Sequence, residues 1–370
     1  MKKVIVGLLI LIITSVILYF IPKEEKELYA ITVDGQKVNT MPSSGNYDVT
    51  VKCTNATGVW NYTEWGIDLT DVEKDYSCII EFTTSNKTIL NNYVISLNNQ
   101  AAGDGKVVNE NGYRYEGTNP NNYVLYNGEL WRIIGVFGSK MHGQTGNLVK
   151  IIRNESIGGL VYNTSNTVNS WGASTLYKLL NQTSGGSYYT GVDYTNKSSG
   201  TYCSSYYGYT PIDCSFSKTG IRSDYARGMI QEATWYSTAY AVPDIQPYNA
   251  YLNDITTTTK STGYIGLMYA SDYGYAVQAS DCARTTALSS YDGSTTGLTC
   301  AGKNWLRLGE EEWTISRISE NSSWTVENHG GLEGDGIQVG HIVRPVLYLK
   351  SSVYYVSGSG TYDDPIVIGN

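Results

Sequence analysis

An apolar run near the N-terminus constrains this chain more than any other feature. The segment from Val4 to Ile21 is almost wholly apolar, and Lys2 and Lys3 precede it. At about 1.5 Å of rise per residue, a helix of this length spans most of the roughly 30 Å hydrocarbon core of a bilayer. The two lysines favour a cytoplasmic N-terminus. The sequence therefore predicts a cytoplasmic stub and transmembrane anchor over residues 1–21, single-pass in the cell membrane, with the C-terminal domain extracellular.

A cleaved signal peptide is the alternative interpretation of this run. Signal peptides have a shorter apolar region, of about 7 to 15 residues, and a small-x-small cleavage site. Here Leu28 occupies a small-residue position in the sequence Leu28-Tyr29-Ala30, which makes a poor site. We therefore favour an uncleaved anchor, and both interpretations export the chain.

The composition is typical of an extracellular, β-rich or lectin-like surface. Charged residues make up 16% of the chain, which holds 33 Tyr and 39 Gly, so its polar character comes from hydroxyls, amides and aromatic rings. The net charge is −8, and Lys and Arg form no cluster beyond the anchor. Because phosphate binding needs clustered cations, we exclude nucleic acid as a partner.

The cysteines predict disulfides. The six of them fall in three local couples: Cys53 with Cys78, Cys203 with Cys214, and Cys282 with Cys300. An even number in an exported chain indicates disulfide bonds, although six cysteines allow 15 connectivities. We favour pairing of neighbours. A zinc site would need closely spaced cysteines with nearby histidines, a spacing that this chain lacks.

Residues 22–85 predict a small β module. Short β-prone runs are separated by turn residues, and Asp34-Gly35 favours a tight hairpin because glycine tolerates positive φ. The middle of the module carries Trp60, Tyr62 and Trp65. These rings are interpreted either as a carbohydrate platform or, as we favour, as the core of a domain that needs large aromatics and a disulfide.

The remaining chain predicts a connecting helix over residues 86–100, a large domain over 101–352 and a tail strand over 353–370. The apolar spacing predicts helices at Thr88–Leu97, Ser174–Asn181 and Ser223–Tyr236. Strands are expected at Tyr123–Tyr126, Leu130–Phe137, Leu148–Arg153, Val343–Leu349 and Ile366–Ile368.

Several stretches together resemble a known domain. They are Arg114–Val124, Asn127–Phe137, Ile265–Tyr269, Ser271–Ala276, Asn304–Leu306, Trp313–Ser316 and Val343–Leu349. They resemble a domain of many uncharacterised exported proteins of low-GC bacteria. The first module, with Cys53 and the Trp60-x-Tyr62-x-x-Trp65-Gly66 spacing before Cys78, is similar to a small domain that often precedes it.

The resemblance implies a fold but no activity, since that family's function is unknown. Its closing signature is similar to domains of the C-type-lectin-like and formylglycine-generating-enzyme-like superfold. The expected fold class is therefore α+β, with a transmembrane helix, a small β module and a C-type-lectin-like mixed α+β domain. This chain departs from the family pattern at Ala270 and Arg317, where proline is usual.

Candidate binding residues lie in the last third of the chain. Trp305, Trp313 and Trp324 occur among amides and carboxylates, a combination that suits sugars. Core packing explains Trp305 and Trp313 equally well, so Trp324 is the better surface candidate. Arg344 interrupts an apolar strand and must be paired. It is either a ligand anchor or a structural partner of an acid such as Asp272.

Acidic residues suggest two further kinds of chemistry. Glu333 and Asp335 offer carboxylates in an expected loop, where lectin-like domains sometimes hold calcium; no other cofactor or metal is expected. Glu310, Glu312 and Asp272 are carboxylates that acid–base catalysis could use. No nucleophile elbow, phosphate loop or histidine-based metal motif occurs in the sequence.

These observations predict a surface-anchored extracellular binding or adhesion protein that recognises a glycan or a cell-surface partner. Two alternatives remain open at this point. One is a structural envelope component without a small ligand, and the other is a carboxylate-dependent enzyme that modifies wall polymers.

Overall fold

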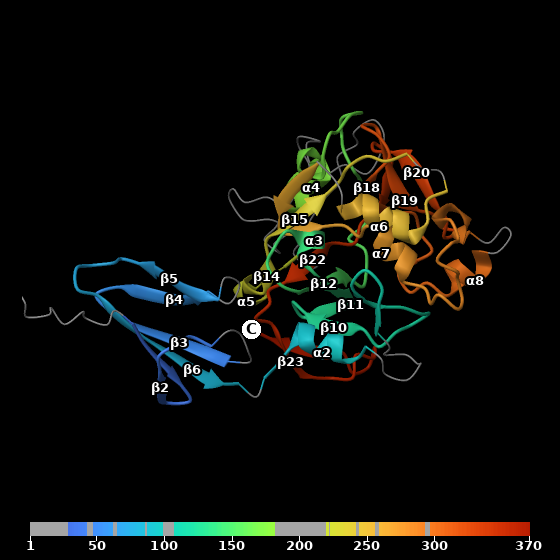
Figure 1. Ribbon diagram of the computed structural model, residues 1–370. Helices are drawn as coiled ribbons and strands as arrows, with labels where there is room; N and C mark the ends of the chain where they lie inside the picture. The colour runs from blue at the N-terminus through green and yellow to red at the C-terminus, as the bar shows by residue number, and fades with distance from the viewer. Residues whose placement is uncertain are drawn as a thin grey trace, which may run out of the picture. The chain divides into compact units, whose positions relative to one another are not determined.

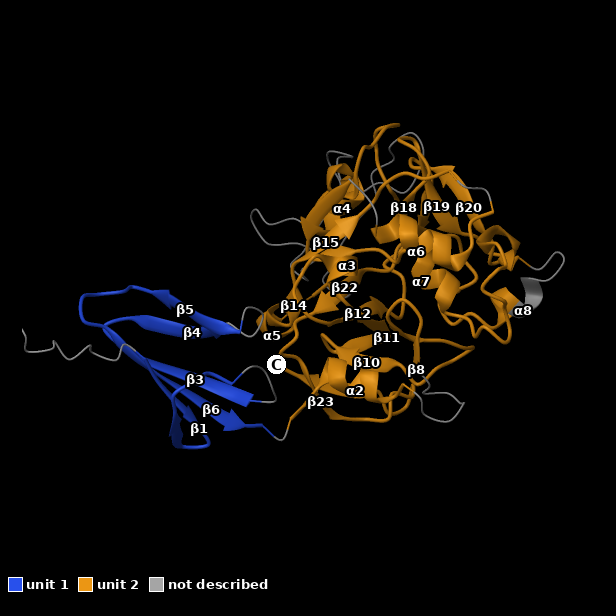
Figure 2. Cartoon of the chain, in the orientation of Figure 1, with its two compact units in different colours: residues 1–61, 65–85 blue, residues 62–64, 86–370 orange. Residues whose placement is uncertain are grey.

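The computed structural model describes residues 29–42, 47–61, 65–85, 87–98, 107–181, 220–221, 223–241, 244–255, 259–292 and 297–370. The chain divides into two compact units (Figure 2). The first comprises residues 1–61 and 65–85, and the second comprises residues 62–64 and 86–370. The predicted anchor over residues 1–21 and the predicted Cys203–Cys214 disulfide lie outside the described residues.

The first unit is built of strands throughout the part described. A four-stranded sheet has the order β2 (Gln36–Val38), β1 (Tyr29–Val33), β6 (Ser77–Thr84) and β3 (Tyr47–Thr54), and a separate hairpin joins β4 (Thr57–Asn61) to β5 (Gly66–Thr70). The predicted Asp34-Gly35 turn is confirmed. Both residues have positive φ, of 47° and 79°, and Val33 pairs with Gln36 across the turn.

A disulfide and an aromatic core stabilise the first unit. Cys53 and Cys78 lie directly opposite each other on β3 and β6 and form the predicted disulfide. Trp60 is 7% exposed, and its ring packs edge-on against Phe82 with the ring centroids 5.1 Å apart. Trp60 therefore belongs to the core, as the core-filling interpretation predicts, whereas Tyr62 lies outside the described residues.

The second unit is organised around an eleven-stranded sheet (Figure 1). Its strands pair in the order β14 (Ile230–Gln231), β22 (Val346–Leu349), β12 (Leu148–Arg153), β11 (Glu129–Phe137), β10 (Tyr123–Tyr126), β24 (Ile366–Gly369), β23 (Tyr354–Ser357) and β7 (Thr88–Ile89). In addition, β17 (Ile265–Gly266) pairs with β22, and β9 (Tyr113–Tyr115) pairs with β11 and with β8 (Val107–Asn109). Residues 353–370 thus contribute two strands to this sheet.

Smaller elements complete the second unit. A five-stranded sheet has the order β13 (Gly159–Val161), β21 (Gly340–Ile342), β18 (Glu312–Arg317), β19 (Ser322–Val326) and β20 (Leu332–Gly336), and a hairpin joins β15 (Ala233–Tyr236) to β16 (Lys260–Gly263). The helices are α2 (Leu90–Ser96), α3 (Ser139–His142), α4 (Thr175–Leu180), α5 (Asp224–Gly228), α6 (Pro247–Ile255), α7 (Ala270–Tyr275) and α8 (Gly297–Gly302), with 3₁₀ turns η1 (Trp171–Ala173) and η2 (Leu288–Tyr291).

The central strands form where the sequence is rich in apolar residues. All residues of β12 and β22 are buried, and so are the last seven of β11. Strands that are covered on both faces read as apolar runs and not as alternating patterns. The strands predicted at Tyr123–Tyr126, Leu130–Phe137 and Leu148–Arg153 are confirmed.

The predicted α+β fold class is wrong. Strands make up 40% of the described residues and helices 17%, so this part of the protein is mostly β-sheet. Of the helices described, none exceeds the nine residues of α6. No helix among the described residues is long and apolar enough to cross a bilayer. In the described residues, the expected mixed α+β, lectin-like domain is therefore replaced by a β-rich architecture.

One predicted helix accounts for part of this error. The helix expected over Ser223–Tyr236 ends at Gly228, and the residues after it form β14 and β15. The β15 strand Ala233–Tyr236 alternates between buried and half-buried residues, which is the pattern of a strand with one covered face. Its Thr, Trp and Tyr are also β-prone, so local propensity agrees with the strand.

Candidate functional site

The three tryptophans predicted to bind a ligand lie inside the second unit. Their exposed fractions are 4% for Trp305, 1% for Trp313 and 5% for Trp324. The indole N–H of Trp305 donates to the carbonyl of Tyr115 at 2.9 Å, and that of Trp313 donates to the carbonyl of Leu160 at 2.8 Å. The expectation that Trp324 lies at the surface is wrong, because that side chain packs in the core.

Arg344 is paired in the interior. Its Nε and Nη2 donate to the two carboxylate oxygens of Glu312, each at 2.8 Å, and Nη2 also donates to the carbonyl of Leu306 at 2.6 Å. Burial raises the pKa of Glu312, and Arg344 opposes that rise. The structural interpretation of Arg344 is confirmed, but its partner is Glu312 and not Asp272.

Asp272 lies at the centre of a buried charge cluster. It stands in the first turn of α7, and its carboxylate accepts from Arg114 Nη1 at 3.0 Å, from Lys150 and from the Tyr269 backbone N–H at 2.9 Å. Arg114 comes from β9 and Lys150 from β12. Burial by itself would raise the pKa of Asp272, but the two cations outweigh it and the pKa is lowered. The cluster ties α7 to the large sheet.

The expected calcium loop is part of a strand. Glu333 and Asp335 lie on β20, which pairs with β19. The Glu333 side chain is exposed and approaches His329 at 3.5 Å, whereas Asp335 Oδ2 lies 2.8 Å from His341 Nε2. In the described part of the chain, no group of three or more His, Cys, Asp or Glu side chains is placed to hold a metal ion.

The residues predicted to form one binding site are therefore not brought together on an open surface. Glu333 is exposed, while the side chains of Trp305, Trp313, Trp324, Arg344 and Asp272 are buried and bonded or packed inside the second unit. Their arrangement stabilises the fold.

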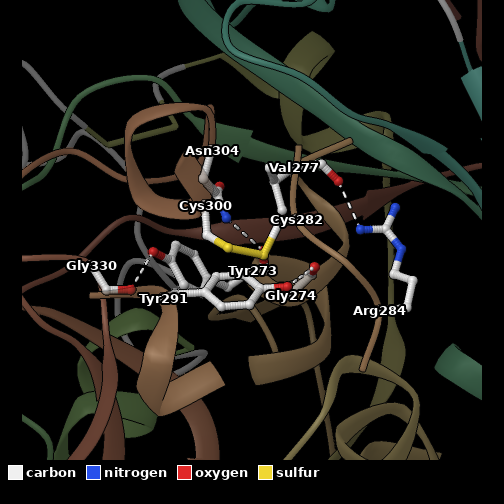
Figure 3. Close-up of a disulfide and its surroundings, with 9 residues drawn as sticks. All are labelled: Tyr273, Gly274, Val277, Cys282, Arg284, Tyr291, Cys300, Asn304 and Gly330. Carbon is white, nitrogen blue, oxygen red and sulfur yellow. Dashed lines mark hydrogen bonds between the residues drawn. A yellow bond between two sulfur atoms is a disulfide. The ribbon is translucent and has the colours of Figure 1, made fainter. Parts of the chain in front are cut away.

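The Cys282–Cys300 disulfide fixes the segment that leads to Trp305 (Figure 3). Beside it lie the rings of Tyr273 and Tyr291. The Tyr291 hydroxyl donates to the carbonyl of Gly274 at 2.9 Å, and Asn304 donates to the carbonyl of Tyr273 at 2.8 Å. The predicted pairing of these two cysteines is confirmed, and it joins α8 to the loop that follows α7.

Asp254 is a second buried carboxylate, on α6. It is 3% exposed and accepts from the Ser316 hydroxyl at 2.7 Å and from the Ser271 backbone N–H at 3.1 Å. In the described part of the chain, no lysine, arginine or histidine lies within ion-pair distance of it. Burial raises its pKa to about 6, although these hydrogen bonds oppose the rise.

We expect Asp254 to make the folded protein less stable as the pH rises from about 4 to about 6. In this range the unfolded chain has lost the Asp254 proton and the folded chain retains it, so folding takes up a proton. A pKa of about 6 against an ordinary value near 4 corresponds to roughly 3 kcal/mol. Urea unfolding at pH 4, 5, 6 and 7 would show this loss in the wild type and not in Asp254→Asn. Parallel pH profiles for the two proteins would contradict it.

A cavity of about 410 Å³ lies over the start of α4 and the loop after β13. Its lining consists mainly of hydroxyl and amide side chains: Thr164, Ser165, Thr167, Thr175, Asn163 and Asn169. Ser165, Thr167 and Asn169 are exposed, so the cavity opens to solvent. Val168, Ala173 and Lys178 complete its wall.

Asn163 holds the loop that lines this cavity in place. Its side chain is 5% exposed, and its Oδ1 accepts from the Thr175 backbone N–H at 2.9 Å and from the Thr175 hydroxyl at 3.2 Å. Its Nδ2 donates to the carbonyls of Ser165 and Thr167, each at 3.0 Å. All the hydrogen-bonding capacity of this amide thus goes into shaping the loop.

Arg317 holds the other end of the loop. Its guanidinium donates to the carbonyls of Val168 and Asn169 in the loop, and to those of Ser237 and Ser319 outside it. Burial lowers the pKa of Arg317.

The lining suits hydrogen bonding to a polar ligand. Hydroxyls and amides donate and accept hydrogen bonds, as a hydroxyl-rich ligand requires. The described lining includes one cation, Lys178, and no carboxylate, histidine or cysteine. The sequence analysis did not single out these residues. The available signal was the dense run of Asn, Thr and Ser from Asn163 to Ser170.

Comparison with known proteins finds no matching family model, no similar curated protein and no similar solved structure.

Proposed function

We propose that this protein is an exported binding protein that recognises a glycan at the cell surface through the cavity beside α4. The observation that carries the proposal is the cavity of about 410 Å³ with six hydroxyl or amide side chains in its lining. Asn163 and Thr175 bond to each other and shape the loop, and Thr164, Ser165, Thr167 and Asn169 are the side chains that would meet a ligand. A sugar presents hydroxyls along its rim, and such a lining provides their partners.

The disulfides support the extracellular location. Cys53–Cys78 and Cys282–Cys300 are formed, and structural disulfides persist in oxidising compartments. The paired carboxylates argue against the catalytic alternative. Glu312 and Asp272 are bonded to arginine and lysine in the interior, where acid–base work on a polymer has no access to them.

The test is binding of the purified full-length protein to an oligosaccharide array, followed by titration with the best neutral oligosaccharide. Ala173→Trp places an indole in the cavity, and we expect it to weaken binding at least tenfold. The matched control is Ser139→Trp, at an exposed position of α3 outside the cavity lining, which should bind as the wild type does. A blank array with correctly folded protein would reject the proposal, as would equal binding by the two tryptophan variants.

A further inference from the structure

Arg132 lies between two aromatic rings in the second unit. It belongs to β11, and the centre of its guanidinium is 4.2 Å from the ring centroid of Tyr123 and 4.5 Å from that of Trp305. Rings this close cover part of the flat surface of the guanidinium, whose N–H donors point outward along its edge. A further hydrogen-bond partner would therefore meet it at that edge.

Most of that edge is already bonded. Nε donates to Asn122 Oδ1 at 2.8 Å, and Nη2 donates to Asn119 Oδ1 at 3.3 Å and to the carbonyl of Pro120 at 3.2 Å. Nη1 makes no hydrogen bond within the described residues. It is also not one of the fully buried polar atoms that lack a hydrogen-bond partner. The exposed 6% of Arg132 therefore leaves Nη1, with two N–H donors, accessible to solvent.

The charge of Arg132 is also uncompensated within the described residues. Three other buried arginines have carboxylate partners there: Arg114 has Asp272, Arg153 has Glu129 and Arg344 has Glu312. Arg317 has none either, but all three of its guanidinium nitrogens donate to backbone carbonyls. No carboxylate lies within ion-pair distance of Arg132 in this part of the chain. Burial lowers its pKa to about 10, and Arg344 nearby contributes to the same effect. A bound carboxylate would supply the missing negative charge and accept from Nη1.

An exposed ring lies next to Tyr123, the tyrosine that stacks on Arg132. Tyr362 is 60% exposed, and its ring meets that of Tyr123 edge-on at a centroid distance of 5.5 Å. The apolar face of a pyranose packs well on such a ring. A tyrosine platform beside an open arginine edge suits an acidic sugar better than an extended acidic peptide, whose carboxylates lie on flexible stems.

We infer that Arg132 Nη1 and Tyr362 form a second site, which takes the carboxylate of an acidic sugar. Like the proposed function, this second site takes a glycan, but it consists of different residues and does not depend on the cavity beside α4. Its probe is therefore a uronic-acid oligosaccharide, compared with a neutral oligosaccharide of equal length.

The experiment titrates the full-length protein with oligogalacturonate by calorimetry. We expect Arg132→Lys, which keeps the charge but loses the planar donors, to weaken binding at least tenfold, and Tyr362→Ser at least threefold. The matched control for the exposed ring is Tyr248→Ser on α6, where Tyr248 is 51% exposed, and it should have no effect. Rising salt should weaken binding of the wild type.

The outcomes separate this site from the cavity. Ala173→Trp should bind oligogalacturonate as the wild type does, so the loss of the cavity and the loss of the Arg132 site are distinguishable. Wild-type affinity in both Arg132→Lys and Tyr362→Ser overturns the inference. If Arg132→Lys does not fold, Tyr362→Ser decides alone. Tighter binding of polyglutamate than of oligogalacturonate overturns the assignment to a sugar.

Discussion

Replacing Asp272 by Asn should destabilise the second unit by about 3–5 kcal/mol. The change leaves the side chains of Arg114 and Lys150, which are 3% and 0% exposed, without their shared carboxylate. Removing one member of a buried ionic group is costly because the remaining charges are desolvated and unpaired. The free energy of unfolding, from urea titration at neutral pH, measures the effect.

The matched control is an ion pair at the surface of the same unit. Asp224 and Arg227 pair on α5, and the Asp224 side chain is 99% exposed. Asp224→Asn should cost less than about 1 kcal/mol, since water screens exposed pairs. A loss in Asp272→Asn as small as that of the control would show that the buried cluster does not stabilise the fold.

Removing the Cys282–Cys300 disulfide should have the second-largest effect, about 3 kcal/mol. The two cysteines are 18 residues apart. Closing a loop of this length lowers the conformational entropy of the unfolded chain, which stabilises the folded state by about 3 kcal/mol. The double variant Cys282→Ser with Cys300→Ser avoids a free thiol. Urea unfolding should show a lower midpoint. Tryptophan fluorescence is a suitable probe, because Trp305 comes directly after the disulfide-linked helix α8.

The control for this prediction is Cys53→Ser with Cys78→Ser, which removes the disulfide of the first unit. It should leave unchanged the unfolding of the second unit, since the bond lies in the other compact unit. An unaltered midpoint in the Cys282 and Cys300 variant would mean that packing around Tyr273 and Tyr291 suffices to hold the segment.

Local features of the fold were predictable from the sequence. Asp34-Gly35 specified its turn because glycine tolerates positive φ, and the long apolar runs specified β11 and β12. Neighbouring cysteines paired as expected at both described disulfides. Each of these features depends on residues that are close in sequence or on an uninterrupted pattern.

Long-range pairing was not predictable. The need of Arg344 for an acid followed from its position in an apolar strand, but its partner could have been any of several acids. Arg132 occurs in a similar setting, between Trp131 and Ile133, and the same argument applied to it. Nothing in the sequence distinguishes the arginine that meets a carboxylate from the one that meets two rings and amides.

The binding residues were predicted poorly because aromatic side chains suit a core as well as a sugar. Trp324 occurs among polar residues in the sequence, yet β19 places it in the interior. Short hydroxyl side chains gave a weaker signal, although they line the cavity. Their significance depends on a loop that Asn163 and Arg317 shape through bonds to distant backbone groups.

The pairing of β24 has a consequence for when this protein can fold. Ile366 and Val367 pair in parallel with Val124 and Leu125, and β23 then pairs with Thr88 and Ile89. The sheet therefore joins segments separated by more than two hundred positions, and such distant contacts form slowly. The second unit can therefore complete this sheet only after residues 366–369 have been synthesised and are free to pair with β10.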